Sequence, residues 1–414
     1  MNDNQHIPSG YKPSPLGIIP EDWEVKRLGE VCTFLDSQRI PIKDADRGKM
    51  QGKYPYYGAS GIIDYVNDYI FDDDLILLGE DGANIITRST PLAFLVSGKV
   101  WINNHAHVLK TNKGYNRYYI CNYLESLSYD KYNTGTAQPK LNQEVCEKIP
   151  VLLPSEEEQN NISNLLTLWD TAIAKQTTLI EQLTLRKRGL MQQLLTEKKR
   201  LKGFEGEWKK LKLGECGKFL SNNTLSREQL NERSGTVQNI HYGDILIKYP
   251  SILDCDKVTL PFITESAYKD SMTDFVKNGD IVISDTAEDE TVGKACEVQN
   301  IGTNKILAGL HTMLFRPDEG LFSPFFLGYY INSEVYHSKL IPLIQGIKVC
   351  SIGKQAMQNT TISIPTIDEQ NAIASILINA DKEIEIQKQK LEAMQEQKKG
   401  LMQVLLTGKR RIKT

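Results

Sequence analysis

Two stretches of the sequence decide the fold: residues 154–195 read PSEEEQNNISNLLTLWDTAIAKQTTLIEQLTLRKRGLMQQLL, and residues 365–406 read PTIDEQNAIASILINADKEIEIQKQKLEAMQEQKKGLMQVLL. Each begins with a proline and a capping box, in which a Ser or Thr precedes a Glu by three residues and marks the start of a helix. Apolar residues then recur at alternating steps of four and three residues. Because a mean step of 3.5 residues is typical of a coiled-coil seam, each stretch predicts one long helix that packs against another helix.

Polar residues interrupt both seams at matching steps. A Gln occupies the same seam position in each helix (Gln176 and Gln387), and so does a Lys (Lys187 and Lys398). Polar residues in a seam reduce stability but fix the register and the partner. We therefore expect the two helices to pair with each other in an antiparallel direction, since the globular segment before each helix needs its own space. Pairing of each helix with another protein is the alternative.

The segments before the two helices also repeat, at a different distance along the chain. Residues 21–35, EDWEVKRLGEVCTFL, match residues 206–220, GEWKKLKLGECGKFL, at an offset of 185, whereas the helices match at an offset of 211. The second inserted segment is therefore longer by 26 residues, the difference between the two offsets. A repeated frame around unlike segments indicates one architecture that presents two different surfaces.

The inserted segments contain short β-type runs that end at Gly, Asn, Asp or Pro, with short helices expected at 118–127 and 325–336. We therefore predict an α+β fold with two globular domains, separated by two long antiparallel coiled-coil helices in a pseudo-twofold repeat. The predicted division is residues 1–153 for the first domain, 154–202 for the first helix, 203–364 for the second domain and 365–414 for the second helix.

Composition narrows the class of protein. The chain has 414 residues, a net charge of −3 and seven cysteines without a C-x-x-C pair, a pattern typical of reduced thiols. It contains no run of about 18 apolar residues that would predict a membrane helix. The polar start, MNDNQHIPSGYKPSPLG, contains no apolar signal core. We therefore expect a cytoplasmic protein with no membrane contact.

Two basic strips lie at the ends of the expected helices. Such strips are either solvated helix ends, whose cations are favourable near the negative pole of the helix dipole, or contacts to nucleic-acid phosphates. The near-neutral net charge argues against binding through bulk charge alone. The strips comprise Arg186, Lys187, Arg188, Lys198, Lys199, Arg200 and Lys202, and then Lys398, Lys399, Lys409, Arg410, Arg411 and Lys413.

Motifs for catalysis are missing from the sequence. It contains no G-x-x-x-x-G-K-[ST] loop, no G-x-G-x-x-G and no N/D-P-P-Y/F box. His105 and His107 would share one face of a strand, but no further ligand follows at a usual metal spacing. Acidic runs at 72–74, 80–81 and 288–290 are interpreted as turns and loops, with nuclease carboxylates as the minor alternative. We therefore expect no catalytic residue and no metal site in this chain.

Polar loops in both inserted segments carry residue types that read base edges. Asn and Gln can bond adenine in a bidentate manner, and Lys can reach guanine or phosphate. Each residue taken singly is also compatible with an ordinary surface loop. The candidate DNA-binding residues are Asn103, Asn104, His105, Thr136, Gln138 and Lys140 in the first segment, and His311, Gln345 and Lys348 in the second.

Taken together, these motifs resemble the specificity subunit of a type I restriction–modification system, over nearly the whole chain. The second half departs from the first where it has Gln345-Gly346-Ile347-Lys348-Val349 in place of the A-Q-P-K-L string. The motifs that carry the resemblance are 17–23 (GIIPEDW), 28–30 (LGE), 135–141 (GTAQPKL), 149–150 (IP) and 154–159 (PSEEEQ), followed by 206–208 (GEW), 213–215 (LGE), 308–311 (AGLH) and 365–370 (PTIDEQ).

The resemblance implies two target-recognition domains, each of which reads one half of a split site on double-stranded DNA. The paired helices would set the length of the unread gap between the half-sites. The subunit would have no catalytic residues of its own. Two methyltransferase subunits and restriction/translocase subunits would assemble with it, and S-adenosylmethionine, ATP and Mg would bind to those partners.

Three other interpretations remain open. The chain could be the recognition subunit of a type IIB-like enzyme that cuts on both sides of its site. It could be a coiled-coil scaffold whose domains bind protein and not DNA. It could also be a self-contained methyltransferase, for which S-adenosylmethionine binding by the chain alone would be the sign.

Overall fold

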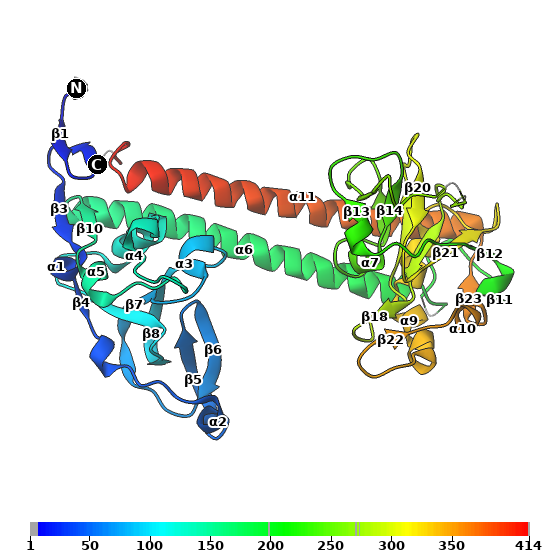
Figure 1. Cartoon of the computed structure of the whole chain (residues 1–414), viewed down its shortest axis with the longest axis horizontal. Coiled ribbons are helices and arrows are strands. Elements are labelled where there is room, and N and C mark those ends of the chain that lie inside the picture. Colours follow the sequence, from blue (N-terminus) through cyan, green and yellow to red (C-terminus); the bar gives the residue numbers. More distant parts are fainter. Residues whose placement is uncertain (1–6, 198, 270, 273, 413–414) are drawn as a thin grey trace. The chain divides into compact units, whose positions relative to one another are not determined.

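The computed structural model describes residues 7–197, 199–269, 271–272 and 274–412 (Figure 1). Contacts divide the chain into two units. The first comprises the chain up to Thr177 together with the part from Gln389 onward, and the second comprises Thr178–Lys388. Each unit therefore contains one globular domain and one half of each long helix.

The two long helices have the same length. Helix α6 spans Glu156–Leu194 and helix α11 spans Ile367–Leu405, 39 residues each, so that both bounds differ by the offset of 211. The hydroxyl of Ser155 accepts a hydrogen bond from the backbone N–H of Glu158 (3.2 Å), and the corresponding bond caps α11 (3.4 Å). These bonds satisfy an N–H group that the first helical turn leaves without a partner.

In both units α6 and α11 run in opposite directions (Figure 1). In the first unit Lys398 Nζ lies 2.6 Å from Asp170 Oδ1, and in the second unit Lys187 Nζ lies 2.6 Å from Asp381 Oδ1. The lysine lies on α11 in the first pair and on α6 in the second. This exchange is expected when two copies of one helix pack antiparallel. The seam glutamines are buried or half-buried, Gln176 and Gln387 respectively.

The start of α6 is held by side chains from both ends of the chain. The buried Glu158 carboxylate accepts hydrogen bonds from Trp23 Nε1 (3.1 Å) and from the Arg411 guanidinium (2.7 Å). Arg411 also binds both carboxylate oxygens of Asp22 at 2.8 Å. The end of the chain is thereby fixed against the segment that leads into the first domain.

The same anchor occurs at the start of α11 in the second unit. Glu369 accepts hydrogen bonds from Trp208 Nε1 (3.2 Å) and from Arg200 (2.6 Å). Arg200 and Arg411 belong to the two basic strips. Neither interpretation of the strips predicted that these arginines bind a carboxylate in the first turn of a long helix. Lys198 and Lys413 of these strips lie outside the described residues.

The first domain is built on a six-stranded sheet. The strand order is β4-β9-β7-β8-β5-β6, and all neighbours are antiparallel except β5 and β8. Central strand β7 carries the run Leu75–Leu78, which is completely buried because both faces of the sheet are covered. The strands are β4 (Cys32–Phe34), β9 (Ala106–Thr111), β7 (Phe71–Gly79), β8 (Ala93–Ile102), β5 (Gln51–Gly58) and β6 (Gly61–Val66).

The other elements of the first unit surround this sheet, and strand β3 pairs with β10 just before α6 begins. They are β1 (Tyr11–Ser14), β2 (Gly17–Pro20), β3 (Glu24–Arg27), α1 (Leu28–Val31), η1 (Asp36–Gln38), α2 (Asp44–Arg47), α3 (Asn84–Thr87), α4 (Arg117–Ser126), η2 (Asp130–Tyr132), α5 (Gln143–Glu147) and β10 (Pro150–Leu153).

The second domain has a five-stranded sheet, β12-β21-β17-β19-β15, and a four-stranded sheet, β13-β16-β14-β20. The strands of the first are β12 (Gly217–Leu220), β21 (Thr312–Pro317), β17 (Ile281–Ser284), β19 (Ala295–Gln299) and β15 (Ile252–Asp254). Those of the second are β13 (Leu230–Asn231), β16 (Phe262–Ile263), β14 (Gln238–Ile240) and β20 (Ile306–Ala308).

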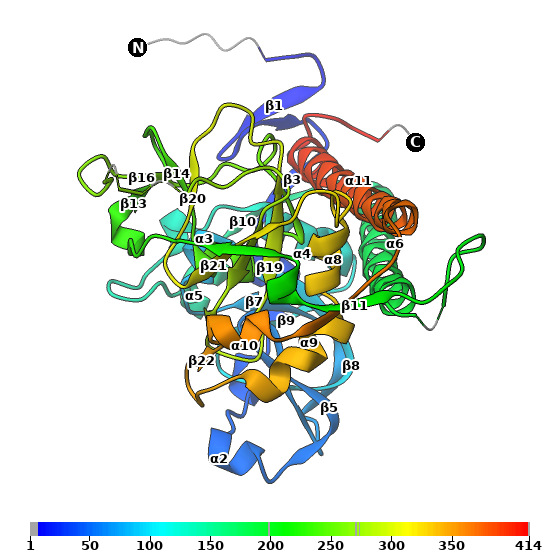
Figure 2. The ribbon, with the colours of Figure 1, turned by 90° about the vertical axis from the view of Figure 1, so that its right-hand side faces the viewer.

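Short elements complete the second unit (Figure 2). They are β11 (Lys209–Lys212), η3 (Leu213–Glu215), η4 (Arg227–Gln229), α7 (Tyr242–Ile247), β18 (Thr286–Ala287), α8 (Phe326–Ile331), α9 (Glu334–Leu340), η5 (Ile341–Leu343), β22 (Cys350–Ser351), α10 (Lys354–Gln358) and β23 (Thr361–Ile364).

The two domains share one frame. Strands β4, β9, β7 and β8 of the first domain have the same order and direction as β12, β21, β17 and β19 of the second, and the pair β3–β10 corresponds to β11–β23. The architecture therefore confirms the predicted α+β class, the internal repeat and the antiparallel long helices.

The helix predicted at 118–127 is confirmed as α4, but the one predicted at 325–336 is two helices. Chain direction changes at Asn332-Ser333, where the Ser333 hydroxyl accepts a hydrogen bond from Tyr336 N–H and starts α9. The Asn332 amide instead binds the backbone of Ala295 on β19. Among the residues that the structure describes, no helix has the length and the apolar character required to cross a membrane.

Candidate nucleic-acid interface

In the first domain three segments that are distant in the sequence meet where strand β7 ends. The backbone N–H of Glu80 donates to His105 O (2.8 Å), and the N–H of Leu141 donates to Glu80 O (2.8 Å). The N–H of Gly82 donates to Pro139 O (3.1 Å). The segments 80–82, 103–105 and 134–141 thus form one continuous surface, which we call the first interface.

Two of the predicted residues, His105 and Lys140, each lie beside an acidic side chain of this surface. His105 Nδ1 lies 2.8 Å from Asp81 Oδ2, and Lys140 Nζ lies 3.4 Å from Glu80 Oε1. The side chains of His105 and Lys140 remain about half exposed, at 51% and 49% of their area. The structure therefore brings together His105 and Lys140, and each keeps hydrogen-bonding capacity toward solvent.

The asparagines at 103 and 104 differ in their surroundings. Asn103 is buried, its Oδ1 accepts from His105 N–H (2.8 Å) and its N–H donates to Tyr57 O (3.1 Å). Its side chain therefore shapes the turn that presents His105. Asn104 is exposed at the tip of the same turn.

Loop 134–141 is closed so tightly that it needs a glycine. Asn133 Oδ1 accepts from the N–H groups of Gly135 (3.0 Å) and Lys140 (2.9 Å). A Cβ atom on Gly135 would lie only 1.8 Å from Gln138 O. Thr136 and Gln138 are exposed on the tip of this loop, so the backbone holds two predicted DNA-binding side chains in fixed positions.

A buried ionic cluster supports the first interface from below. Arg39 binds Glu80 (2.7 Å) and Asp36 (3.4 Å), and His107 Nδ1 lies 2.5 Å from Asp36 Oδ2. His107 Nε2 lies 2.9 Å from Leu141 O. Burial alone would lower the pKa of His107, but the hydrogen bonds and charges of Asp36 and Cys146 together outweigh it and raise the pKa to about 10. The imidazolium form can therefore donate at both nitrogens, to Asp36 and to the interface loop.

The expectation that the two histidines share one strand face was wrong. His105 lies in the turn before β9 and His107 lies buried within β9, so they do not share a strand face. Asp36 and Glu80 also lie near His107, with potential ligand atoms within 4.8 Å of one another. Because the Arg39 guanidinium already binds both carboxylates, these residues form an ion network in which a cation is built in.

The second domain repeats the backbone frame of this surface. The N–H of Asp285 donates to His311 O (3.1 Å), and the N–H of Ile352 donates to Asp285 O (2.9 Å). Strand β18 pairs with β22, which holds loop 345–352 against the end of β17. The segments 285–287, 309–311 and 345–352 form what we call the second interface.

His311 is the counterpart of His105. It has a left-handed backbone (φ 54°) and a side chain that is 47% exposed. Its Nδ1 lies 3.3 Å from Thr286 Oγ1 and 3.5 Å from Asp285 Oδ1. The ring of Tyr242 packs edge-on against it at 5.3 Å, so that His311 is oriented from two sides.

The loop of the second interface also closes on a glycine. Gln345 and Ser351 exchange two backbone hydrogen bonds (2.9 and 2.8 Å). Gly346 has φ +100°, and a Cβ atom there would lie 2.0 Å from Val349 O. The exposed tip carries Lys348 and Ile347, of which the latter is 98% exposed. Gln345 is exposed at the base of the loop.

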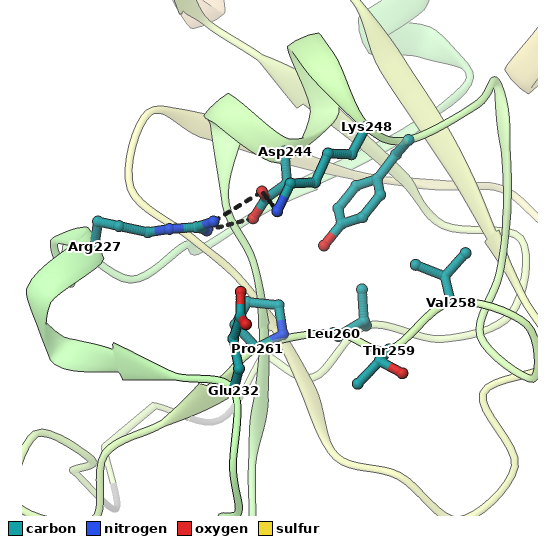
Figure 3. Close-up of a pocket in the computed structure, with 9 residues that line it drawn as sticks. Arg227, Glu232, Asp244, Lys248, Val258, Thr259, Leu260 and Pro261 are labelled. Atoms are coloured by element: carbon teal, nitrogen blue, oxygen red, sulfur yellow. Dashed lines mark hydrogen bonds and ion pairs between the residues drawn. The ribbon is translucent and has the colours of Figure 1, made fainter. Parts of the chain in front are cut away.

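Helix α7, which carries Tyr242, also contributes Asp244 to the lining of a pocket. Figure 3 shows Arg227 and Lys248 converging on Asp244 of α7, with Arg227 Nη2 at 3.0 Å and Lys248 Nζ at 3.2 Å from Asp244 Oδ1. Burial would raise the pKa of Asp244, but its hydrogen bonds to Arg227 and Lys248 lower it below the ordinary value. The charges of Arg227, Asp244 and Lys248 are therefore paired, which is typical of a structural anchor for α7.

Sequence reasoning missed four members of the two interfaces and the tyrosine that packs against His311. Glu80 and Asp81 were interpreted as part of a turn, and Asp285, Thr286 and Tyr242 were not singled out. A signal was present for the first four, because these polar residues come where an apolar strand ends (ILLGED and IVISDT). The ends of central strands are where loops from neighbouring strands converge.

Comparison with known proteins identifies the family. The family model described as "Type I restriction modification DNA specificity domain" matches residues 20–185 and 205–396. The chain is similar to the type I restriction enzyme MjaVIII specificity subunit of Methanocaldococcus jannaschii, with 27% identity over 95% of this chain and 94% of the relative. It is also similar to the putative type I restriction enzyme specificity subunit S.HindORF215P of Haemophilus influenzae, with 26% identity over 86% of each chain.

Solved structures share the fold. The S subunit of a type I restriction–modification system from M. genitalium aligns with a TM-score of 0.54 and 12% identity, over 98% of both chains. A chain from a structural study of complex assembly and conformational transition in the type I R-M system aligns with a TM-score of 0.58 and 15% identity, over 95% and 99%. Since two copies of the family model cover most of its length, the chain belongs to the type I restriction–modification DNA specificity family.

Proposed function

We propose that this chain is the DNA-recognition subunit of a type I restriction–modification complex and that it reads a bipartite site on double-stranded DNA. The observation that carries this proposal is the repetition of one surface. Each domain presents a half-exposed His and a glycine-closed loop in the same hydrogen-bond frame. The loop tips differ in sequence, which suits two half-sites that differ in sequence.

The exposed groups on both interfaces are suited to DNA. In the first, the Gln138 amide and Asn104 can donate to and accept from base edges, and Lys140 can reach a phosphate. In the second, Lys348 and Gln345 offer the same chemistry. His105 and His311, each oriented through Nδ1, present the opposite ring nitrogen as a further hydrogen-bonding group.

The long helices are proposed to set the number of base pairs between the half-sites. A 39-residue helix is about 60 Å long at 1.5 Å per residue, whereas one turn of B-DNA is about 34 Å. The copied ion pairs, Lys187–Asp381 and Lys398–Asp170, fix the helices against sliding. A fixed helix register suits a fixed gap.

The chemistry is proposed to reside in partner subunits. We propose that two methyltransferase subunits and restriction/translocase subunits assemble with this chain in the cytoplasm, and that S-adenosylmethionine, ATP and Mg bind to them. Support comes from the relatives, which are named as specificity subunits of type I restriction enzymes, and from the solved relative in a study of type I complex assembly. Adenine methylation by such a partner would require the base to be flipped out of the duplex.

Selection of DNA by the assembled complex tests the proposal. The chain is co-purified with the methyltransferase subunit encoded beside it and mixed with random-sequence duplexes at several salt concentrations, and the retained duplexes are sequenced. We expect enrichment of a split motif and retention that weakens as salt rises. S-adenosylmethionine should bind to the complex and not to this chain alone. Retention without sequence preference, or S-adenosylmethionine binding by the isolated chain, would contradict the proposal.

A further inference from the structure

The two domains differ most in one part of their shared frame. The offset between matching residues is 185 at Phe34 and Phe219 and reaches 205 at Glu80 and Asp285, whose backbone groups make the same hydrogen bonds. Most of the 26-residue difference therefore arises between β4 and the end of β7 in the first domain, and between β12 and the end of β17 in the second. In the first domain this part contains α2 and the β5–β6 hairpin.

The β5–β6 hairpin adjoins the first interface. Strand β5 pairs with β8 through Tyr56 and Trp101, and the N–H of Asn103 donates to Tyr57 O (3.1 Å). A Cβ atom on Gly79 would lie 2.8 Å from Ala59 O in the hairpin turn. The turn of the hairpin thus lies directly beside the residue that precedes Glu80.

The outer strand of this hairpin is apolar and exposed. Strand β6 is the edge of the six-stranded sheet, and Ile62, Ile63 and Tyr65 are 46%, 54% and 49% exposed. The register places Tyr56 opposite Asp64 but Tyr57 opposite Ile62, which leaves Ile63 as an extra residue in β6. Such a bulge redirects side chains, so that two consecutive isoleucines both face solvent. An exposed apolar edge strand promotes aggregation unless a partner covers it.

The base of the hairpin is rigid. Tyr56, Val66 and Trp101 are buried together in one apolar cluster, and Arg47 Nε binds Asp64 Oδ2 at 2.8 Å. The Arg47 guanidinium also lies 5.2 Å from the centre of the Tyr56 ring. The exposed apolar side chains are therefore presented by a fixed backbone, as a reading element requires.

Two cations lie together beside the hairpin, at the end away from its turn, where Tyr54 pairs with Val66. Lys53 Nζ lies 5.2 Å from the Tyr54 ring centre and Lys99 Nζ lies 4.6 Å from the Tyr69 ring centre. The two rings pack against each other at 5.1 Å. Both lysines can therefore reach a phosphate on one side of the ribbon while its exposed side chains contact the bases.

We propose that the β5–β6 hairpin reads bases of the first half-site, by apolar contact of Ile62, Ile63 and Tyr65 with thymine methyl groups in the major groove, which admits a two-stranded ribbon. This inference rests on the proposed function. Strand β6 has no counterpart in the five-stranded sheet of the second domain. Its base contacts would therefore add to those proposed for loop 134–141 and act on the first half-site only.

The test compares methylation motifs of substituted chains. Ile62→Ser with Ile63→Ser, and separately Tyr65→Ser, are co-expressed with the methyltransferase subunit in a host without DNA methylation, and N6-methyladenine is mapped by sequencing. We expect discrimination at one or more positions of the first half-site to fall about tenfold, the effect of losing one favourable base contact. The gap and the second half-site should not change.

Two controls make the result specific. Ile86→Ser alters an equally exposed isoleucine of the same domain (53%) that lines a pocket with α4 and α11, and it should leave the motif intact. Gln138→Ala, which removes a proposed base-edge group of the first interface, should change the first half-site as well and leave the gap and the second half-site intact. An unchanged motif in both hairpin variants would overturn the inference, and so would loss of co-purification with the methyltransferase, which would make the hairpin a protein interface. Failure of the proposed function would appear separately, as the absence of a split motif in the unsubstituted chain.

Discussion

Four side chains beneath the first interface, Asp36, Arg39, Glu80 and His107, connect buried charge to an exposed loop. His107 links Asp36 to Leu141 O, and Arg39 links Asp36 to Glu80, whose backbone binds both His105 and Leu141. Removing one partner of a buried ion pair leaves an uncompensated charge, which costs far more than the intact pair contributes. The position of the interface loop therefore depends on the protonation of His107.

Stability of the first unit should depend on pH through His107. Its pKa is about 10 in the folded chain and about 6.5 in an unfolded one. Because the pKa is higher in the folded chain, protonated His107 stabilises the fold fully below about pH 6.5. This stabilisation is lost as pH rises toward 10. We expect His107→Gln to lower the free energy of unfolding by about 3 kcal/mol at neutral pH and to flatten its decline between pH 7 and 10, measured by urea unfolding. His105→Gln, at an exposed position, is the control, and an unchanged slope in His107→Gln would contradict the assignment.

The loop glycines should be indispensable to methylation. Gly135→Ala and Gly346→Ala place a Cβ atom within 2.0 Å of a carbonyl oxygen, so each loop must open. We expect methylation by the assembled complex to fall at least tenfold in either variant, measured as N6-methyladenine per site. Gly189→Ala in α6, where a Cβ atom meets nothing within 4 Å, should retain activity and gain about 1 kcal/mol of stability. Wild-type activity in both loop variants would show that the closed loops are not needed.

At the level of whole elements, α6 and α11 are copies in length, caps and ion pairs. Each has in its first turn a Glu that binds a Trp and an Arg, and each carries a seam Lys bound to an Asp of the other helix. Those aspartates, Asp170 and Asp381, are themselves 211 residues apart. Copied contacts of this kind keep the helices in one register when both are lengthened equally.

Equal lengthening of the helices should change the gap and nothing else. One heptad inserted into each helix, after Thr177 and after Lys388, preserves the seam and adds about 10 Å at 1.5 Å per residue, or roughly three base pairs at 3.4 Å each. We expect the methylation motif to keep both half-sites and to widen its gap by about that amount.

The matched control for the longer helices is three residues inserted after Thr177 alone, which breaks the 3.5-residue period and should abolish methylation. Changed half-sites with an unchanged gap would contradict the role of the helices.

Local patterns in the sequence were sufficient for the helices, and insufficient for the interfaces. Spacing and caps predicted α6 and α11 because both signals lie within a few residues of each other. The strand order brings Asp36, Glu80 and Leu141 close to the histidines, and no local pattern in the sequence encodes that order. The break between α8 and α9 likewise depends on Asn332, whose amide binds a strand that lies far away in the sequence.

At the scale of the whole molecule, each of the two units contains one interface. Each unit also contains one part of α6 and one part of α11, so that the same frame occurs in both. Among the described residues, each interface as defined above consists of residues of its own unit, which is consistent with the proposal that each domain reads one half-site. The second interface has an apolar tip at Ile347 where the first has Thr136. Two such interfaces, joined by helices of fixed register, would account for the proposed split site with a constant gap.

The measurement that tests this account most directly is the methylome of the intact chain. It is co-expressed with its methyltransferase subunit in a host without DNA methylation, and N6-methyladenine is mapped by sequencing. The account predicts one split motif with two unlike half-sites and an invariant gap. A single continuous motif, or no methylation by a complex that assembles stably, would contradict it.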